Sequence, residues 1–341
     1  TVLYSGSDTT YNHTGLTPAT DYFYQAWSYD GSNTYSSGTD ANTTTFASEP
    51  SGHPSGFSAS ATGPTRITVS WTDSGADSYL VKASDTGYSN IPVPVDGTVE
   101  ADSRLVKSVA SGIGSALFKG LDPATQWYFN IFPYNGSGSA VNYKTDGTVP
   151  QATATTDDLQ LDLLITEVAD PSDSSNAKYV ELYNSGTGSI NLSDVPIYLA
   201  RQANGGSYGS VLLEGSVAAG DFILLAYDSV LFVNSFSIQA DYYESVVSGN
   251  GDDGYFLFYD GDYDSGFLFD AYGVPDQDGT GQDWEYLNGH SVRKRGITAP
   301  NSTFTMDEWV FIGANHDQMT PGAHAETVTW QGTSSTDWNE R

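Results

Sequence analysis

Strict alternation of apolar and polar residues marks the clearest strand of the chain. Ile67, Val69 and Trp71 take every second position, with Thr and Ser between them. Successive side chains of a strand point to opposite faces, so this pattern predicts a half-buried strand with one face in a core. Two further apolar runs, 255–259 and 267–272, predict strands on either side of an Asp-rich turn. We expect helix to be nearly absent.

A short segment of the chain recurs at an offset of 105 residues. GLTPAT at 15–20 returns as GLDPAT at 120–125, and each copy leads into an alternating aromatic strand and a turn. Tyr22 of the first copy corresponds to Trp127 of the second. Such an offset is typical of one β-sandwich domain. Because only 14 residues precede the first copy, we expect the first domain to lack its early strands.

Residues 48–156 resemble a fibronectin type III domain, and residues 1–47 resemble the C-terminal half of another. The family usually has Tyr at the aromatic corner, as Tyr22 does in the first copy, whereas Trp127 in the second puts the corner hydrogen bond in question. The segment 48–57 is rich in Pro, Gly and Ser, which predicts a linker. The residues that carry the resemblance in the second copy are Trp71, Leu121, Pro123, Thr125 and Trp127.

Residues 157–325 resemble the lamin tail domain of bacterial secreted proteins. The motifs that carry this likeness are ITEV, YVELYN, INLS, DGTGQDWEY and a terminal TPG. The resemblance implies an immunoglobulin-like β-sandwich. Residues 326–341 predict the start of a further module or a tail.

The expected fold class is therefore all-β, in the form of tandem immunoglobulin-like β-sandwiches. Chains of this build resemble multidomain Bacteroidetes proteins that are cargo of type IX secretion. That resemblance implies a secreted or cell-surface location, and other domains of the same parent chain as partners.

The chain is strongly acidic, with 42 Asp and Glu against 12 Lys and Arg and a formal net charge of -30. A polyanion would be repelled, so we expect no direct binding of nucleic acid. The run 293–295, Arg-Lys-Arg, is expected on the solvated surface. The absence of Cys excludes disulfides and thiolate metal sites. The apolar stretch 222–233 is interrupted by Asp228 and is shorter than the ~20 residues that span a bilayer, so membrane insertion is not expected.

Carboxylate density between 249 and 283 suggests calcium as a cofactor. Oxygen ligands at alternate positions of a turn suit a hard cation. The spacing differs from an EF-hand, because Gly266 comes one place late and no Glu follows at position twelve. Simple acidic turns on an acidic protein are the favoured interpretation, with calcium as the other. The candidate ligands lie in two loops, one with Asp260, Asp262 and Asp264, the other with Asp276, Asp278 and Asp283.

Catalytic motifs are missing from the sequence, which has no P-loop, nucleophile elbow or paired-His zinc motif. Glu167 and Glu181 could form an acid–base pair, but each lies in an expected strand whose alternation puts polar residues on the outer face. His316 lies just before the TPG motif, where the lamin tail resemblance implies a closing strand or turn. We expect no catalytic residues and no enzyme activity.

The leading functional hypothesis is a non-catalytic spacer, adhesion or presentation unit of a larger secreted or cell-surface protein, with an unidentified surface protein or glycan as partner. The alternative is an accessory region, binding substrate or surface, of an extracellular hydrolase such as a nuclease or polysaccharide-degrading enzyme. Its catalytic domain would then lie outside these residues. Aromatic residues at 22, 24, 127 and 129 keep glycan binding open, although strand spacing favours their packing in the fold.

Overall fold

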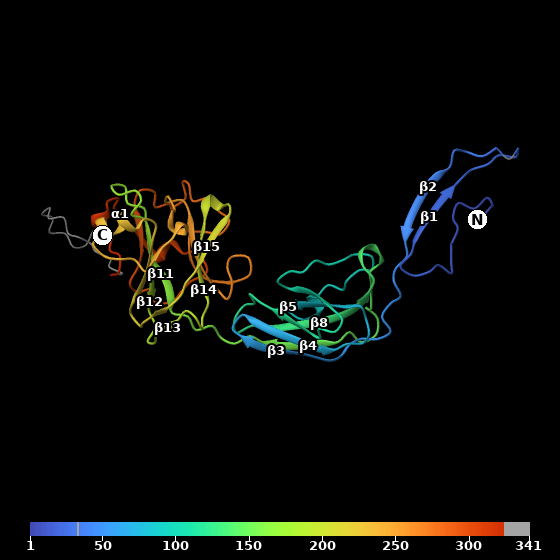
Figure 1. The fold of residues 1–341 in the computed structure, drawn as a ribbon, viewed down its shortest axis with the longest axis horizontal. Coiled ribbons are helices and arrows are strands. Elements are labelled where there is room, and N and C mark those ends of the chain that lie inside the picture. The colour runs from blue at the N-terminus through green and yellow to red at the C-terminus, as the bar shows by residue number, and fades with distance from the viewer. Residues whose placement is uncertain (33, 324–341) are drawn as a thin grey trace. The chain divides into compact units, whose positions relative to one another are not determined.

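The computed structural model describes residues 1–32 and 34–323. The chain divides into two compact units, Thr1–Leu159 and Gln160–Arg341. Within the described residues, a single α-helix accompanies sheets whose strand pairs are antiparallel with one exception, β17 with β18 (Figure 1). The expected all-β class is confirmed. The further module expected at 326–341 lies outside the described residues.

The first unit contains one isolated hairpin and one sandwich of two sheets. The hairpin is β1 (Asp21–Ala26) with β2 (Thr39–Thr44), in a register that places Asp21 opposite Thr44. One sheet of the sandwich has the order β3-β4-β7 and the other β10-β8-β5-β6, with β9 also paired to β8. Their bounds are β3 (Ser55–Gly63), β4 (Arg66–Thr72), β5 (Ser78–Ser84), β6 (Val106–Ala110), β7 (Ser115–Phe118), β8 (Gln126–Asn135), β9 (Asn142–Tyr143) and β10 (Gln151–Thr155).

The core of this sandwich forms where the alternating strand predicted it. Ile67 and Val69 of β4 are fully buried and Trp71 is nearly so, while the residues between them are more exposed. They pack against Tyr79 of β5 and Phe129 of β8, on the facing sheet. Each such buried side chain contributes roughly 1.5–3 kcal/mol of hydrophobic stabilisation. The prediction of a half-buried strand is confirmed.

The two repeated turns share a backbone conformation but differ in one hydrogen bond. Ala19 and Ala124 both have positive φ, 50° and 48°. In the first copy the Thr17 amide donates to the Tyr22 hydroxyl at 2.8 Å. In the second, Trp127 is buried and its indole Nε1 has no partner. An indole N–H can only donate, so it cannot accept from a backbone amide as the Tyr hydroxyl does.

Over its described residues, the second unit has three sheets, of six, four and two strands. Their orders are β18-β17-β12-β11-β21-β22, β15-β14-β19-β20 and β13-β16. The bounds are β11 (Leu163–Ala169), β12 (Tyr179–Asn184), β13 (Ile190–Asn191), β14 (Ile197–Gln202), β15 (Tyr208–Leu212), β16 (Ser216–Val217), β17 (Phe222–Ala226), β18 (Tyr242–Tyr243), β19 (Gly254–Tyr259), β20 (Phe267–Tyr272), β21 (His290–Arg293) and β22 (Trp309–Ile312).

Strand β11 is buried along its whole length, because both faces of the six-stranded sheet are covered. The α-helix α1 (Ser229–Phe236) packs on one face through Phe232, which contacts Tyr179 of β12. Met319, from the segment that follows β22, joins the same cluster. Residues that point away from the sandwich core on β11 and β12 are therefore enclosed by a second layer.

Helix α1 and the strand before it divide the apolar stretch 222–233. Strand β17 ends at Ala226, and α1 begins directly after Asp228. The Asp228 carboxylate accepts hydrogen bonds from the amides of Val230 and Leu231, both at 2.9 Å. This is an N-cap, which satisfies donors at the start of a helix. The short single-turn 3-10 helices of the chain are Tyr88–Asn90, Gly138–Ala140, Ala203–Gly205, Ser245–Val247, Met306–Glu308 and His316–Gln318.

Candidate functional site

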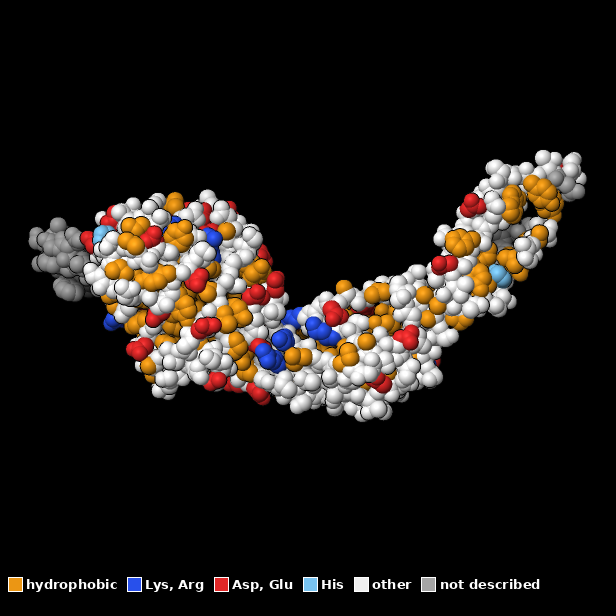
Figure 2. Space-filling model, viewed as in Figure 1, with side chains coloured by type: hydrophobic (Ala, Val, Ile, Leu, Met, Phe, Trp, Pro, Cys, Tyr) orange, Lys and Arg blue, Asp and Glu red, His pale blue; other side chains and the backbone are white. Residues whose placement is uncertain are grey.

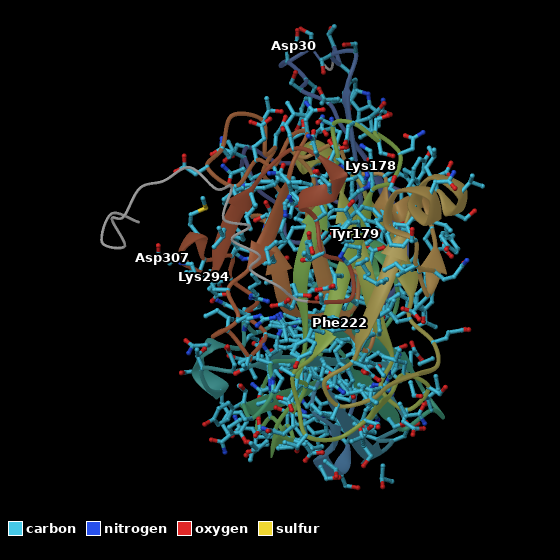
Figure 3. The ribbon with its side chains drawn as sticks, turned by 90° about the vertical axis from the view of Figure 1, so that its left-hand side faces the viewer. Asp30, Lys178, Tyr179, Phe222, Lys294 and Asp307 are labelled. Atoms are coloured by element: carbon cyan, nitrogen blue, oxygen red, sulfur yellow. The ribbon has the colours of Figure 1, made fainter. Side chains whose placement is uncertain are left out.

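Two glutamates meet inside the second unit. Glu167 of β11 and Glu181 of β12 are directly opposite in the antiparallel register, beside a β-bulge that follows Ile165. Both are fully buried. The expectation that they face solvent is wrong. The strand register turns them away from the sandwich core, to the face that Tyr179 occupies, but α1 and the segment after β22 cover that face. Tyr179 is labelled in Figure 3.

The terminal TPG motif supplies hydrogen-bond donors to this pair. The Gly322 amide donates to Glu181 Oε2 at 2.6 Å, and the Thr166 hydroxyl donates to Glu181 Oε1 at 2.6 Å. The Thr320 amide and hydroxyl each donate to Glu167 at 3.4 Å. We call Glu167, Glu181, Thr320 and Gly322 the carboxylate clasp, because these contacts fasten the end of the described chain to the sheet.

Burial shifts the pKa values of Glu167, in the carboxylate clasp, and of His290 beside it. Burial, and next the charge of Glu181, raises the pKa of Glu167 to about 8. Burial lowers the pKa of His290 to about 4. His290 Nε2 lies 3.6 Å from Glu167 Oε1, which is close enough for an ion pair if both groups were charged. Both shifts favour the uncharged forms of Glu167 and His290 near pH 7.

This arrangement has the elements of an acid–base pair but is sealed from substrate. Two adjacent carboxyl groups, one of them with a raised pKa, are a combination that enzymes use for proton transfer. Here Glu167 and Glu181 expose none of their surface, and His290 exposes 2%. The contacts that occupy the two carboxyl groups come from the protein's own turn. The geometry therefore suits holding the turn in place.

A second buried ionic group surrounds Arg293, which the sequence analysis placed on the surface. Arg293 is 1% exposed and donates through Nη1 to both carboxylate oxygens of Asp270, at 2.8 and 2.9 Å. It also bonds Glu308 at 2.6 Å and lies over the ring of Trp309. The surface expectation is wrong for this residue because β21 is an inner strand of the sheet. Lys294 and Arg295 are exposed, and Lys294 reaches the Asp307 carbonyl at 2.6 Å (Figure 3).

The first predicted calcium loop follows β19 and leads to β20. Asp260 is buried and has a φ of 64°. Asp262 accepts the Asp264 amide through Oδ1 at 3.1 Å, which closes a local turn. Asp264 is exposed. The three carboxylates thus have different environments along one turn.

The second predicted loop lies between β20 and β21. Asp276 is exposed, with a φ of 62°, and exchanges two hydrogen bonds with the Gln202 side chain. Asp278 accepts the Thr280 amide at 2.9 Å, and Asp283 is exposed. In the part of the chain that the structure describes, no three His, Asp or Glu side chains are grouped so as to hold a metal. Calcium binding stays a prediction.

Asp252, which belongs to neither predicted ligand set, packs against this second loop. It is 8% exposed, and its Oδ1 has no partner. The neighbouring Asp253 is held by Arg201 at 2.8 Å and by the Asn204 amide at 2.9 Å. The sequence signal was the pair DD before a predicted strand, which alone does not distinguish a buried carboxylate from an exposed one.

A shallow hollow of about 430 Å³ opens on the second unit, with Phe222 on its wall (Figure 3). The Tyr242 hydroxyl there donates to the Glu214 carbonyl at 2.6 Å and accepts the Glu214 amide at 2.7 Å. Acidic side chains are scattered over the visible face of this unit rather than gathered in one patch (Figure 2). Further lining residues are Leu192, Ser216, Ile223 and Asp241.

Comparison with known proteins gives similarity to solved structures only. No protein-family model matches the chain, and no curated protein does. A two-domain fibronectin type III segment of chicken tenascin is 10% identical and covers 64% of this chain and 96% of its own, with a TM-score of 0.25. Domains FN1–FN3 of chicken CNTN1 are 12% identical, covering 72% of each chain, with a TM-score of 0.25. A chitinase from Bacillus thuringiensis is 14% identical, covering 50% of this chain and 25% of its own, with a TM-score of 0.21.

These structural neighbours include tandems of fibronectin type III domains. Over the described residues, no helix has the length and apolar character needed to cross a bilayer.

Proposed function

We propose that this chain is a series of non-catalytic β-sandwich modules that space and present other parts of a larger secreted or cell-surface protein. The observation that carries the proposal is that the chain is fastened by polar contacts where it enters and leaves its sandwiches. A spacer needs such fastening, because a free linker would let neighbouring modules swing independently.

The entrance to the first sandwich is the linker strap, residues 47–49. The Ala47 amide donates to the Ala140 carbonyl at 2.7 Å, and the Asn142 side chain donates to the Ala47 carbonyl at 2.7 Å. The Asn135 side chain donates to the Ser48 carbonyl at 2.8 Å. Backbone groups of this linker are therefore satisfied by the sandwich rather than by water.

Close packing and charge reinforce the linker strap. Lys144 Nζ lies 2.8 Å from a carboxylate oxygen of Glu49. Gly136 has a φ of 82°, and a Cβ placed on it would lie 2.8 Å from the Ala47 Cβ, so only Gly lets the linker come this near. The sequence had predicted a linker here, but not that it is bound.

The exits are fastened in the same way. The Thr156 hydroxyl donates to the Asp122 carbonyl at 2.7 Å, and the Ala124 amide donates to the Asp157 carbonyl at 3.0 Å. In the second unit the carboxylate clasp holds the turn that contains Gly322. Three of the motifs that carry the lamin tail resemblance, ITEV, YVELYN and TPG, thus meet at one place, which supports that family as the identity of the second unit.

A secreted or surface location fits the composition. The net charge of -30 favours solubility, and the sequence has no Cys and therefore no disulfides. In this role the partners are neighbouring domains of the parent chain and a protein or glycan at the surface, as in cargo of type IX secretion.

The spacer proposal is tested by spin labels placed on either side of the linker strap. The chain has no native Cys, so Thr43→Cys and Ser60→Cys give two unique sites, both exposed. Pulsed dipolar spectroscopy is expected to give a narrow distance distribution that broadens in an Asn135→Ala, Asn142→Ala variant. The control is Asn90→Ala, because Asn90 bonds only within its own turn to Thr86. A distribution that is already broad in the unmodified background would refute the proposal.

A further inference from the structure

We propose that Asp252, Asp278 and Thr280 form a binding site for a single calcium ion on the second unit. The site goes beyond the spacer role and differs from both predicted ligand sets, because its central ligand lies outside the two loops. Asp252 lies two residues before β19. Its backbone carbonyl and its side chain both form hydrogen bonds with the loop 276–283.

The first argument is the unsatisfied oxygen of Asp252. The residue is 8% exposed to solvent, yet its Oδ1 has no hydrogen-bond partner. Oδ2 accepts the Thr280 hydroxyl at 3.1 Å, so the carboxylate is directed at the turn that Asp278 and Thr280 form. A buried carboxylate oxygen without a partner carries a desolvation cost that a bound cation would remove.

The second argument is that the loop is built to approach Asp252. The Gly279 amide donates to the Asp252 carbonyl at 3.0 Å. A Cβ on Gly279 would lie 2.5 Å from that carbonyl and 2.6 Å from the Trp284 ring, so the approach requires Gly. Asp278 Oδ1 accepts the Thr280 amide at 2.9 Å, which holds the Asp278 carboxylate on the same turn.

The third argument is charge. Asp253 has its counter-ion in Arg201. Over the described residues, neither Asp252 nor Asp278 forms an ion pair. Two carboxylates of like charge are thus held at one turn, and a divalent ion bound there would be attracted to both.

The donor set indicates calcium among the possible metals. All donors are oxygens, from carboxylates and a hydroxyl, which suits hard cations and not soft ones. Calcium accepts irregular geometry and completes its shell with water, whereas Mg²⁺ demands a near-ideal octahedron. Two carboxylates are few, so we expect a dissociation constant on the order of 10⁻⁴–10⁻³ M, the range of extracellular calcium modules.

The test uses the whole chain with Ca²⁺ and, as a luminescent substitute, Tb³⁺. Trp284 packs on the Gly279 turn, so excitation of tryptophan is expected to sensitise Tb³⁺ bound there, and Ca²⁺ is expected to compete it away. Asp278→Asn is expected to weaken Ca²⁺ binding about tenfold or more, and Asp252→Asn similarly. Asp278 is exposed, so its variant is informative even if the buried Asp252 variant fails to fold.

Matched controls are Asp262→Asn and Asp264→Asn, which lie in the other acidic loop and are expected to leave the affinity unchanged. The proposal is overturned if calorimetry finds no Ca²⁺ binding at millimolar concentration. It is equally overturned if binding survives Asp278→Asn and Asp252→Asn unchanged, or if it is lost in the Asp262 and Asp264 variants instead. None of these outcomes bears on the linker strap, so the spacer proposal is judged separately.

Discussion

Glu167 and Glu181 are paired across two neighbouring strands with no exposed surface on either side chain. Like charges directly opposite in a sheet are destabilising, and burial adds to that cost. The chain reduces both by keeping a proton on Glu167 and by directing the donors of Thr166, Thr320 and Gly322 at the pair. Two adjacent glutamates in an open cleft would suggest catalysis. Here Glu167 and Glu181 instead connect β11 and β12 to the turn that contains Thr320 and Gly322.

The first prediction is that the second unit loses stability as pH rises through neutrality. The pKa of Glu167 is raised from 4.5 to about 8, so between these values the folded state holds a proton that the unfolded chain releases. Its contribution is fully present below about pH 4.5 and is lost as pH approaches about 8. Hydrogen exchange of the β11 and β12 amides at a series of pH values measures this loss. Glu167→Gln is expected to flatten the dependence, and an unchanged slope would show that the proton is elsewhere.

His290 gives a second prediction with the opposite sign. Its pKa falls from 6.5 to about 4 in the folded state, so its contribution is present above about pH 6.5 and is lost as pH falls toward 4. Between about pH 4.5 and 6.5 the two groups oppose each other, and Glu167 acts alone above that range. His290→Gln is expected to remove the acid-side loss. The same exchange experiment checks it, and a variant as acid-sensitive as the parent would contradict it.

The third prediction concerns the buried ion pair of Arg293 and Asp270. Asp270→Asn removes the buried carboxylate charge that Arg293 Nη1 contacts, with Glu308 left as the other partner, and is expected to cost about 3–5 kcal/mol. The control is Asp122→Asn, whose partner Arg104 is 47% exposed at the side chain, and which is expected to cost less than about 1 kcal/mol. Denaturant unfolding measures both. Equal costs would mean that burial does not set the value of the pair.

The fourth prediction tests the start of α1. Asp228→Ala removes an acceptor for two amides and is expected to cost about 0.5–2 kcal/mol. Asp264→Ala, at an exposed position of the acidic loop, is expected to change stability by no more than about 0.5 kcal/mol. If the two variants unfold at the same denaturant concentration, the cap contributes nothing.

Much of the fold was predictable because it depends on local periodicity. The alternation at Ile67, Val69 and Trp71 fixed which face enters the core, and the repeat located both corners. The sequence also indicated that Trp127 would alter the corner hydrogen bond. The indole of Trp127 cannot accept a backbone amide as the Tyr22 hydroxyl does, and its Nε1 has no partner. Helix α1 was missed because a single Asp separates it from a strand of the same composition.

The environment of the charged residues was not predictable. Alternation predicts which face of the sheet Glu167 and Glu181 occupy. Whether that face is exposed to solvent depends on a second layer, formed by α1 and by residues some 140 positions later in the chain. Arg293 likewise owes its burial to the strand on its far side, β22. Periodicity describes one element at a time, whereas burial of a carboxylate depends on what packs over it.

The measurement that tests the central claim most directly is a hydrolysis assay of the purified chain beside its Glu167→Gln and Glu181→Gln variants. Substrates are DNA, RNA and a glycan panel, each with Ca²⁺ and with Mg²⁺. The claim that the carboxylate clasp holds the fold and does not react predicts no turnover by any of the three, while the two variants change the pH dependence of unfolding. Turnover by the parent that disappears in either variant, with the variant's circular dichroism unchanged, would contradict it.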